Sequence, residues 1–183
     1  MSAGCIKKEH CLFDCFFGTS AAINKKVYEG CLVMLEDFIE ANKVDAKLIA
    51  LKEEVRSVAD AVRATGIPAE NHAKSLLFID SNNEPVLVVL LGSDKVSTDK
   101  LKGLLDVKDV RLADKDEVQD ITGYEIGGVP PVSIYGIKTI LDKKVLTREK
   151  VACGGGSTIV EMVIATKEIE KYAFEVQVED IAV

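Results

Sequence analysis

The sequence has few of the residues that nucleophilic hydrolases and nucleotide-binding enzymes need. Only two histidines occur among 183 residues, and no Gly-x-Ser-x-Gly segment is present. Both facts disfavour a serine–histidine–acid triad. The phosphate-loop pattern Gly-x-x-x-x-Gly-Lys-Ser/Thr is also missing. The run Gly154-Gly155-Gly156-Ser157 therefore does not indicate a nucleotide-binding loop.

Cysteine is also used sparingly. The five cysteines are odd in number, include no Cys-x-x-Cys pair and follow no secretory signal, so they predict reduced thiols and a cytoplasmic location. His10, Cys11 and Cys15 lie close together but lack a fourth ligand, so we expect no metal and no other cofactor. The apolar stretch around Cys11 is too short to span a bilayer, which argues against a membrane protein.

Positive charge is in deficit, with 23 basic against 30 acidic residues and a formal net charge of -7. Proteins that grip long stretches of nucleic acid are usually basic. The balance therefore excludes a sequence-reading DNA protein and confines any RNA contact to a short segment, such as one end of the molecule.

The chain divides by pattern into an N-terminal extension, residues 1–30, and one domain, residues 31–183. Apolar spacing and capping residues predict short helices, and apolar runs between turn residues predict strands. The expected helices are 31–42, 58–65, 98–105, 114–122 and 166–172, and the expected strands are 44–51, 75–80, 85–91, 110–112, 138–141 and 158–164. We predict a mixed α/β fold with a curved, barrel-like, mostly antiparallel sheet of about six or seven strands, flanked by short helices.

Two glycine-rich segments and one lysine are the most informative part of the sequence. The segments are Gly123 to Pro131 and Cys153 to Ser157, and the lysine is Lys74, at the mouth of an apolar strand. Glycine clusters expose backbone N–H groups and allow a ligand to approach the main chain. Taken alone, Lys74 reads as a solvated lysine at a strand edge. Beside such turns, however, it could hold a carbonyl or a phosphate.

The order of these motifs resembles the YbaK family, free-standing relatives of the editing domain inserted in bacterial-type prolyl-tRNA synthetases. The similarity runs from about residue 31 to the end. It is carried by Gly66-Ile67-Pro68, Lys74-Ser75-Leu76, Gly123-Tyr124, Gly127-Gly128 with Pro131, and Gly154-Gly155-Gly156. Lys74 matches a lysine that is essential for activity in family members.

The resemblance implies an enzyme that hydrolyses the ester between tRNA and a wrongly attached small amino acid. Such editing is needed where binding alone cannot separate similar amino acids. The partners that it implies are the acceptor end of aminoacyl-tRNA and an aminoacyl-tRNA synthetase. The implied catalytic residues are Lys74, Gly127 and Gly128, the two glycines offering amide groups to the ester carbonyl. The implied substrate-binding residues are Pro131, Gly154, Gly155, Gly156 and Ser157.

The sequence departs from the family at several positions. Bacterial members that remove cysteine carry a tyrosine and a serine where this chain has Leu51 and either Ala152 or Cys153, which puts cysteine specificity in doubt. Glu161 reads as an outward-facing strand residue, and Cys153 reads as a buried free thiol rather than a nucleophile. Two alternatives stay open: a non-catalytic module that binds aminoacyl-tRNA or a synthetase, and a hydrolase of small amino-acid esters.

Overall fold

The computed structural model describes residues 35–183. The chain divides into two units, Met1–Leu32 and Val33–Val183, and all the described residues belong to the second. The proposed extension, with His10, Cys11 and Cys15, lies outside the described residues, so the predicted boundary at residue 30 stays a prediction. Among residues 35–183, no helix is long and apolar enough to cross a membrane.

Among residues 35–183, five short α-helices form where capping residues and apolar spacing predict them. They are α1 (Leu35–Asn42), α2 (Val58–Thr65), α3 (Thr98–Leu105), α4 (Lys115–Thr122) and α5 (Thr166–Tyr172). The Ser57 side chain accepts the Asp60 N–H at the start of α2, and Asp114 and Glu117 form a reciprocal capping box at α4. Thr166 is the first residue of α5, and its hydroxyl donates to the Arg148 carbonyl.

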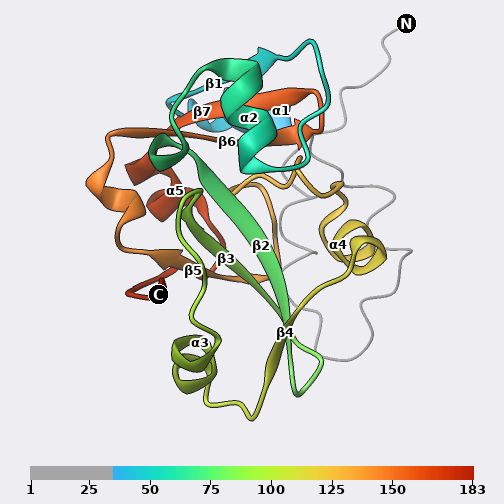
Figure 1. Ribbon diagram of the computed structural model, residues 1–183, viewed down its shortest axis with the longest axis vertical. Coiled ribbons are helices and arrows are strands. Elements are labelled where there is room, and N and C mark those ends of the chain that lie inside the picture. The colour runs from blue at the N-terminus through green and yellow to red at the C-terminus, as the bar shows by residue number, and fades with distance from the viewer. Residues whose placement is uncertain (1–34) are drawn as a thin grey trace, which may run out of the picture. The chain divides into compact units, whose positions relative to one another are not determined.

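In the part of the chain that the structure describes, eight strands form two sheets, which confirms a mixed α and β fold but not a single barrel-like sheet. The small sheet has the order β1-β7-β6, from Ala46–Ala50, Val160–Ala165 and Lys150–Ser157. The larger sheet has the order β4-β2-β3-β5-β8, from Val110–Leu112, Ala73–Asp80, Pro85–Leu91, Lys138–Asp142 and Gln177–Glu179. Most neighbouring strands are antiparallel; β3 with β5 and β5 with β8 are parallel. In Figure 1, β2 runs from beside the small sheet and α2 down to β4.

The two sheets stay separate because a loop occupies the free edge of β6. An isolated bridge joins His72 to Ala152, just before β2 begins. Beyond that bridge, β6 lies against β2 without forming a ladder with it, and it contacts the loop that contains Gly128: the Gly156 N–H donates to the Gly128 carbonyl at 2.9 Å. The predicted single sheet is therefore divided in two at the place where the glycine segment 123–131 meets the glycine segment 153–157.

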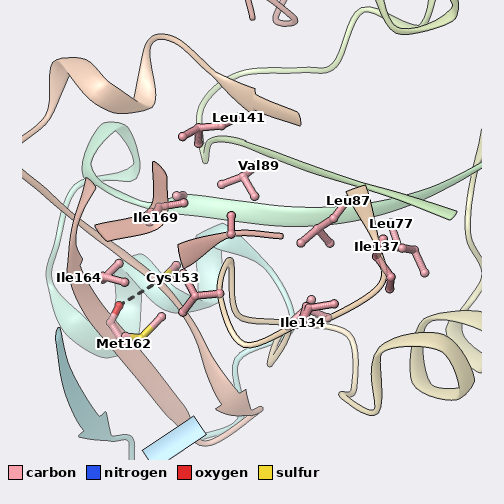
Figure 2. Packing of buried hydrophobic residues seen from close by; sticks show 14 of the residues in the cluster. Leu77, Leu87, Val89, Ile134, Ile137, Leu141, Cys153, Met162, Ile164 and Ile169 are labelled. Carbon is pink, nitrogen blue, oxygen red and sulfur yellow. Dashed lines mark hydrogen bonds between the residues drawn. The ribbon is translucent and has the colours of Figure 1, made fainter. Parts of the chain in front are cut away.

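The β2–β3 hairpin separates two hydrophobic clusters, because alternate residues of a strand face opposite sides of the sheet. Leu77, Leu87 and Val89 face the larger cluster, which also includes Met162, Ile164 and Ile169 (Figure 2). Val88 and Leu90 face the smaller cluster beneath α3. With both faces covered, β3 is buried at six of its seven positions, as its continuous apolar sequence predicts.

Candidate active site

A cavity of about 310 Å³ opens between α2, the start of β2, the loop before Pro130 and the small sheet. It brings together residues from all three parts of the chain that the sequence singled out, among them Lys74, Gly127 and Gly154. The other lining residues are Val55, Arg56, Ser57, Val58, Ala61, His72, Ala73, Ser75, Leu76, Ile126, Val129, Cys153 and Glu161. Most of these are apolar, as is usual for a pocket that binds a small molecule.

Lys74 is the second residue of β2, and its ammonium is anchored by the main chain. Its Nζ donates to the carbonyl oxygens of Gly92 at 3.0 Å and Asp94 at 2.6 Å. Burial lowers the pKa of Lys74 below its ordinary value; Lys95 acts in the same direction and Asp94 opposes it. An ammonium has three N–H donors, so two carbonyl contacts leave one for a ligand in the cavity. Lys74 is thus a fixed, half-buried cation, not the freely solvated lysine that its strand-edge position alone suggested.

Gly127 is exposed at the mouth of the cavity in a conformation that favours glycine. Its φ is +94°, and an added Cβ would collide with the Val55 carbonyl oxygen. No backbone acceptor within residues 35–183 takes its N–H. The amide is therefore available to a ligand oxygen, consistent with the role that the sequence assigned to it.

Gly128 does not line the cavity; instead it allows two backbone segments to pack closely. It is buried, and its N–H donates to the Glu125 carbonyl at 2.9 Å, so that amide is not available to a substrate. A Cβ on Gly128 would lie 2.8 Å from the Ser157 Cα, and one on Gly154 would lie 2.5 Å from the Val129 carbonyl oxygen. The two glycines thus let the loop and β6 touch backbone to backbone. This contact holds Gly127 at the cavity mouth.

The remaining predicted site residues do not line the cavity. Pro131 is buried in the loop, and Gly155, Gly156 and Ser157 form the end of β6. The segment predicted as a second glycine turn is in fact a strand with a bulge between Gly154 and Ser157, and the chain reverses at Thr158 and Ile159. The bulge arises because glycine packs no side chain against the neighbouring strand.

A buried His72–Glu161 pair is the part of the site that the sequence did not predict. Nε2 of His72 lies 3.2 Å from Oε1 of Glu161, and both side chains are almost fully buried. Nδ1 of His72 lies 3.1 Å from the Pro68 carbonyl oxygen. Burial alone would lower the pKa of His72, but the Glu161 carboxylate and the Pro68 carbonyl outweigh it and hold that pKa above its ordinary value. Glu161 therefore faces the cavity rather than solvent.

Cys153 also lines the cavity but is poorly suited to nucleophilic attack. It is 2% exposed, and its Sγ donates to the Met162 carbonyl at 3.5 Å (Figure 2). Burial first, and then the nearby Glu161 carboxylate, strongly raise the pKa of the Cys153 thiol. The reactive form of cysteine is the thiolate, which these surroundings disfavour.

We expect Cys153→Ala to keep hydrolysis within about threefold, because the thiol only fills space, and to lower the free energy of unfolding by about 1 kcal/mol. Deacylation rates and urea unfolding of the same preparation measure both effects. A folded but inactive variant would instead indicate a covalent cysteine mechanism.

Within residues 35–183, the fold thus places the anchored ammonium of Lys74 and the exposed amide of Gly127 at one small cavity. The sequence profile of the aminoacyl-tRNA editing domain matches residues 52–172, and the chain belongs to that family. This confirms the relationship that the order of the motifs predicted. All the cavity-lining residues fall within the matched range.

Curated relatives include proline–tRNA ligases of bacteria. The chain is 32% identical over 104 residues to that of Halalkalibacterium halodurans, a match that covers 57% of this chain and 18% of the ligase. It is 37% identical over 93 residues to that of Lactobacillus helveticus, covering 50% of this chain and 16% of the ligase. The matches thus span less than a fifth of these relatives.

Solved structures are similar over most of their own length. One, described as a candidate trans-editing enzyme for prolyl tRNA synthetase, has a TM-score of 0.69 and 25% identity, covering 90% of this chain and 99% of that one. A hypothetical protein has a TM-score of 0.72 and 29% identity, covering 81% of this chain and 99% of the other. The fold of residues 35–183 therefore matches that of a free-standing chain.

Proposed function

We propose that this protein is a hydrolase that removes a wrongly attached small amino acid from tRNA, acting as a separate chain. Family membership supports the editing role. The observation that carries the catalytic part is the placement of the Lys74 ammonium and the available Gly127 amide around one cavity. Its partners would be the acceptor end of aminoacyl-tRNA and, in the same pathway, a prolyl-tRNA synthetase.

The proposed reaction requires positioning rather than a covalent nucleophile. Water adds to the ester carbonyl carbon, the bond between that carbon and the ribose oxygen breaks, and the ribose oxygen receives a proton. Negative charge develops on the carbonyl oxygen before the bond breaks. The Gly127 N–H is the proposed donor to that oxygen, and the remaining Nζ–H of Lys74 is the proposed donor to the carbonyl or the terminal ribose. Preorganised donors of this kind stabilise such a transition state.

The size of the cavity favours a small amino acid. Its volume of about 310 Å³ is at the low end for ligand pockets. The walls of the cavity below its mouth are mostly buried. Ala61 and Val129 have short side chains and Gly154 has none, so side-chain rotation there can do little to widen the cavity. We infer that the aminoacyl group enters while the tRNA remains outside, where Arg56 and Ser57 lie at the rim.

A panel of aminoacyl-tRNAs tests the proposal. Purified protein is mixed with tRNA for proline carrying alanine, serine, cysteine or proline, and with alanine methyl ester. We expect hydrolysis of at least one small mischarged amino acid, sparing of prolyl-tRNA and little action on the methyl ester. Binding of these tRNAs without hydrolysis would favour a binding module, and faster hydrolysis of the methyl ester would favour a small-ester hydrolase.

A further inference from the structure

The deep part of the cavity contains two buried oxygen atoms without partners. Within residues 35–183, Oε2 of Glu161 and Oγ of Ser75 are buried and make no hydrogen bond, although both residues line the cavity. Nε2 of His72, also in the cavity wall, lies 3.2 Å from Oε1 of Glu161 but likewise makes no hydrogen bond of good geometry. Glu161 comes from β7 and Ser75 from β2, so the two oxygens belong to different sheets. A buried carboxylate oxygen without a donor is costly, and such atoms in native proteins call for an explanation.

The neighbouring groups leave Glu161 Oε2 free for a ligand. His72 approaches the other oxygen, Oε1, and the Lys74 ammonium is held by the Gly92 and Asp94 carbonyls. Cys153 is a neutral thiol bound to the Met162 carbonyl. The ligand group that satisfies Oε2 must therefore be a donor, and a group with several donors and no acceptor could also satisfy the Ser75 oxygen.

An aminoacyl ester carries such a group whichever amino acid is attached. Its protonated α-amino group has three N–H donors, or two in proline, and it lies one carbon from the ester carbonyl. We propose that Glu161, oriented by His72, binds the α-ammonium group of the aminoacyl substrate. This inference rests on the proposed function for the identity of the substrate. It makes Glu161 a substrate-binding residue and His72 a positioning residue.

This arrangement separates the two ends of the substrate. The ammonium lies deep in the cavity at Glu161, and the ester carbonyl lies near the mouth, where Lys74 and Gly127 are found. Charged hydrogen bonds are stronger than neutral ones, so the contact would fix the reacting carbon relative to the mouth. The site would then prefer free aminoacyl esters over esters of acids that lack an amino group.

Binding of two stable analogues tests the proposal without requiring turnover. One is adenosine carrying alanine through a 3′-amide, and the other carries propionate at the same position and differs only in lacking the amine. Calorimetry at pH 6.5 keeps the amine protonated. We expect the wild-type protein to bind the alanyl analogue at least about tenfold more tightly, the usual scale of a hydrogen bond to a charged group. Glu161→Gln should abolish the preference.

Glu170→Gln is the matched control, because Glu170 is exposed on α5 and lies outside the cavity wall. It should keep the full preference. The wild-type comparison decides the question even if Glu161→Gln does not fold. Equal affinity of the wild-type protein for both analogues, or binding of neither, would overturn the proposal. So would an undiminished preference in a folded Glu161→Gln protein.

These results are distinguishable from failure of the proposed function. If the wild-type protein hydrolyses mischarged tRNA but binds both analogues equally, the proposed editing function stands and only the ammonium site is refuted. If the wild-type protein prefers the alanyl analogue but hydrolyses no aminoacyl-tRNA, the ammonium site stands and the proposed hydrolase function is refuted.

Discussion

Replacing Lys74 by alanine is expected to lower the deacylation rate by about 100- to 1,000-fold, the range for loss of one preorganised donor at a developing oxyanion. Among residues 35–183, Lys74 is the only lysine in the cavity wall, and its ammonium is fixed by two carbonyls. Arginine should rescue poorly, since its planar guanidinium cannot occupy the place of a compact ammonium. Single-turnover hydrolysis of a mischarged tRNA measures the loss.

Lys144→Ala is the control for this experiment. Lys144 binds the same neighbour as Lys74, with its Nζ 3.2 Å from Oδ2 of Asp94, but it does not line the cavity. It should keep hydrolysis within about twofold, because surface ion pairs contribute little.

From sequence alone, Lys74→Ala should leave stability almost unchanged. The structure revises this expectation, because two carbonyls lose a donor and the free energy of unfolding should fall by about 1–3 kcal/mol. Full activity in Lys74→Ala would remove Lys74 from the mechanism.

Gly154→Ala is expected to impair both stability and hydrolysis through a single methyl group. The added Cβ would lie 2.5 Å from the Val129 carbonyl oxygen and 2.8 Å from the Gly128 carbonyl carbon. Both neighbours are backbone atoms, so relief requires the loop to move. Forcing a group into a packed site usually costs about 1–3 kcal/mol. Because that loop holds Gly127 at the cavity mouth, hydrolysis should fall at least about tenfold even in the folded fraction.

Gly103→Ala provides the comparison for chemical unfolding and rate measurements. Gly103 is exposed within α3, and a Cβ there would meet nothing within 4 Å. Alanine favours a helix over glycine by about 1 kcal/mol, so this variant should be unchanged or slightly more stable. If Gly154→Ala were as stable and active as Gly103→Ala, the backbone contact between β6 and the loop would not control the site.

Local signals predicted most elements of the fold. Ser57, Asp114 and Gly123 mark helix ends in the sequence, and each does so in the structure. The continuous apolar run from Pro85 to Leu91 predicted a strand buried on both faces. The division into two sheets was not predictable in this way. It depends on a loop that reaches the edge of β6, a long-range contact that no local period records.

The site was predicted only in part, because it too depends on contacts between segments that are distant in sequence. Lys74, Gly127 and Gly154 were identified through motif order, and they line one cavity. The other predicted site residues do not, because a glycine needed for close packing looks the same in sequence as one that contacts a ligand. His72 was missed and Glu161 was interpreted as outward-facing, because each is a single polar residue in or beside an apolar strand. Their proximity appears only when β7 and the start of β2 come together.

The most direct test of the proposed mechanism is hydrolysis of mischarged tRNA with the protein in excess. tRNA for proline carrying labelled alanine is compared with the same tRNA carrying proline, using wild-type and Lys74→Ala proteins. We predict rapid release of alanine by the wild-type protein, intact tRNA that can be charged again, little release of proline, and near-background rates with Lys74→Ala. Equal release of alanine and proline, or equal rates for the two proteins, would contradict the mechanism.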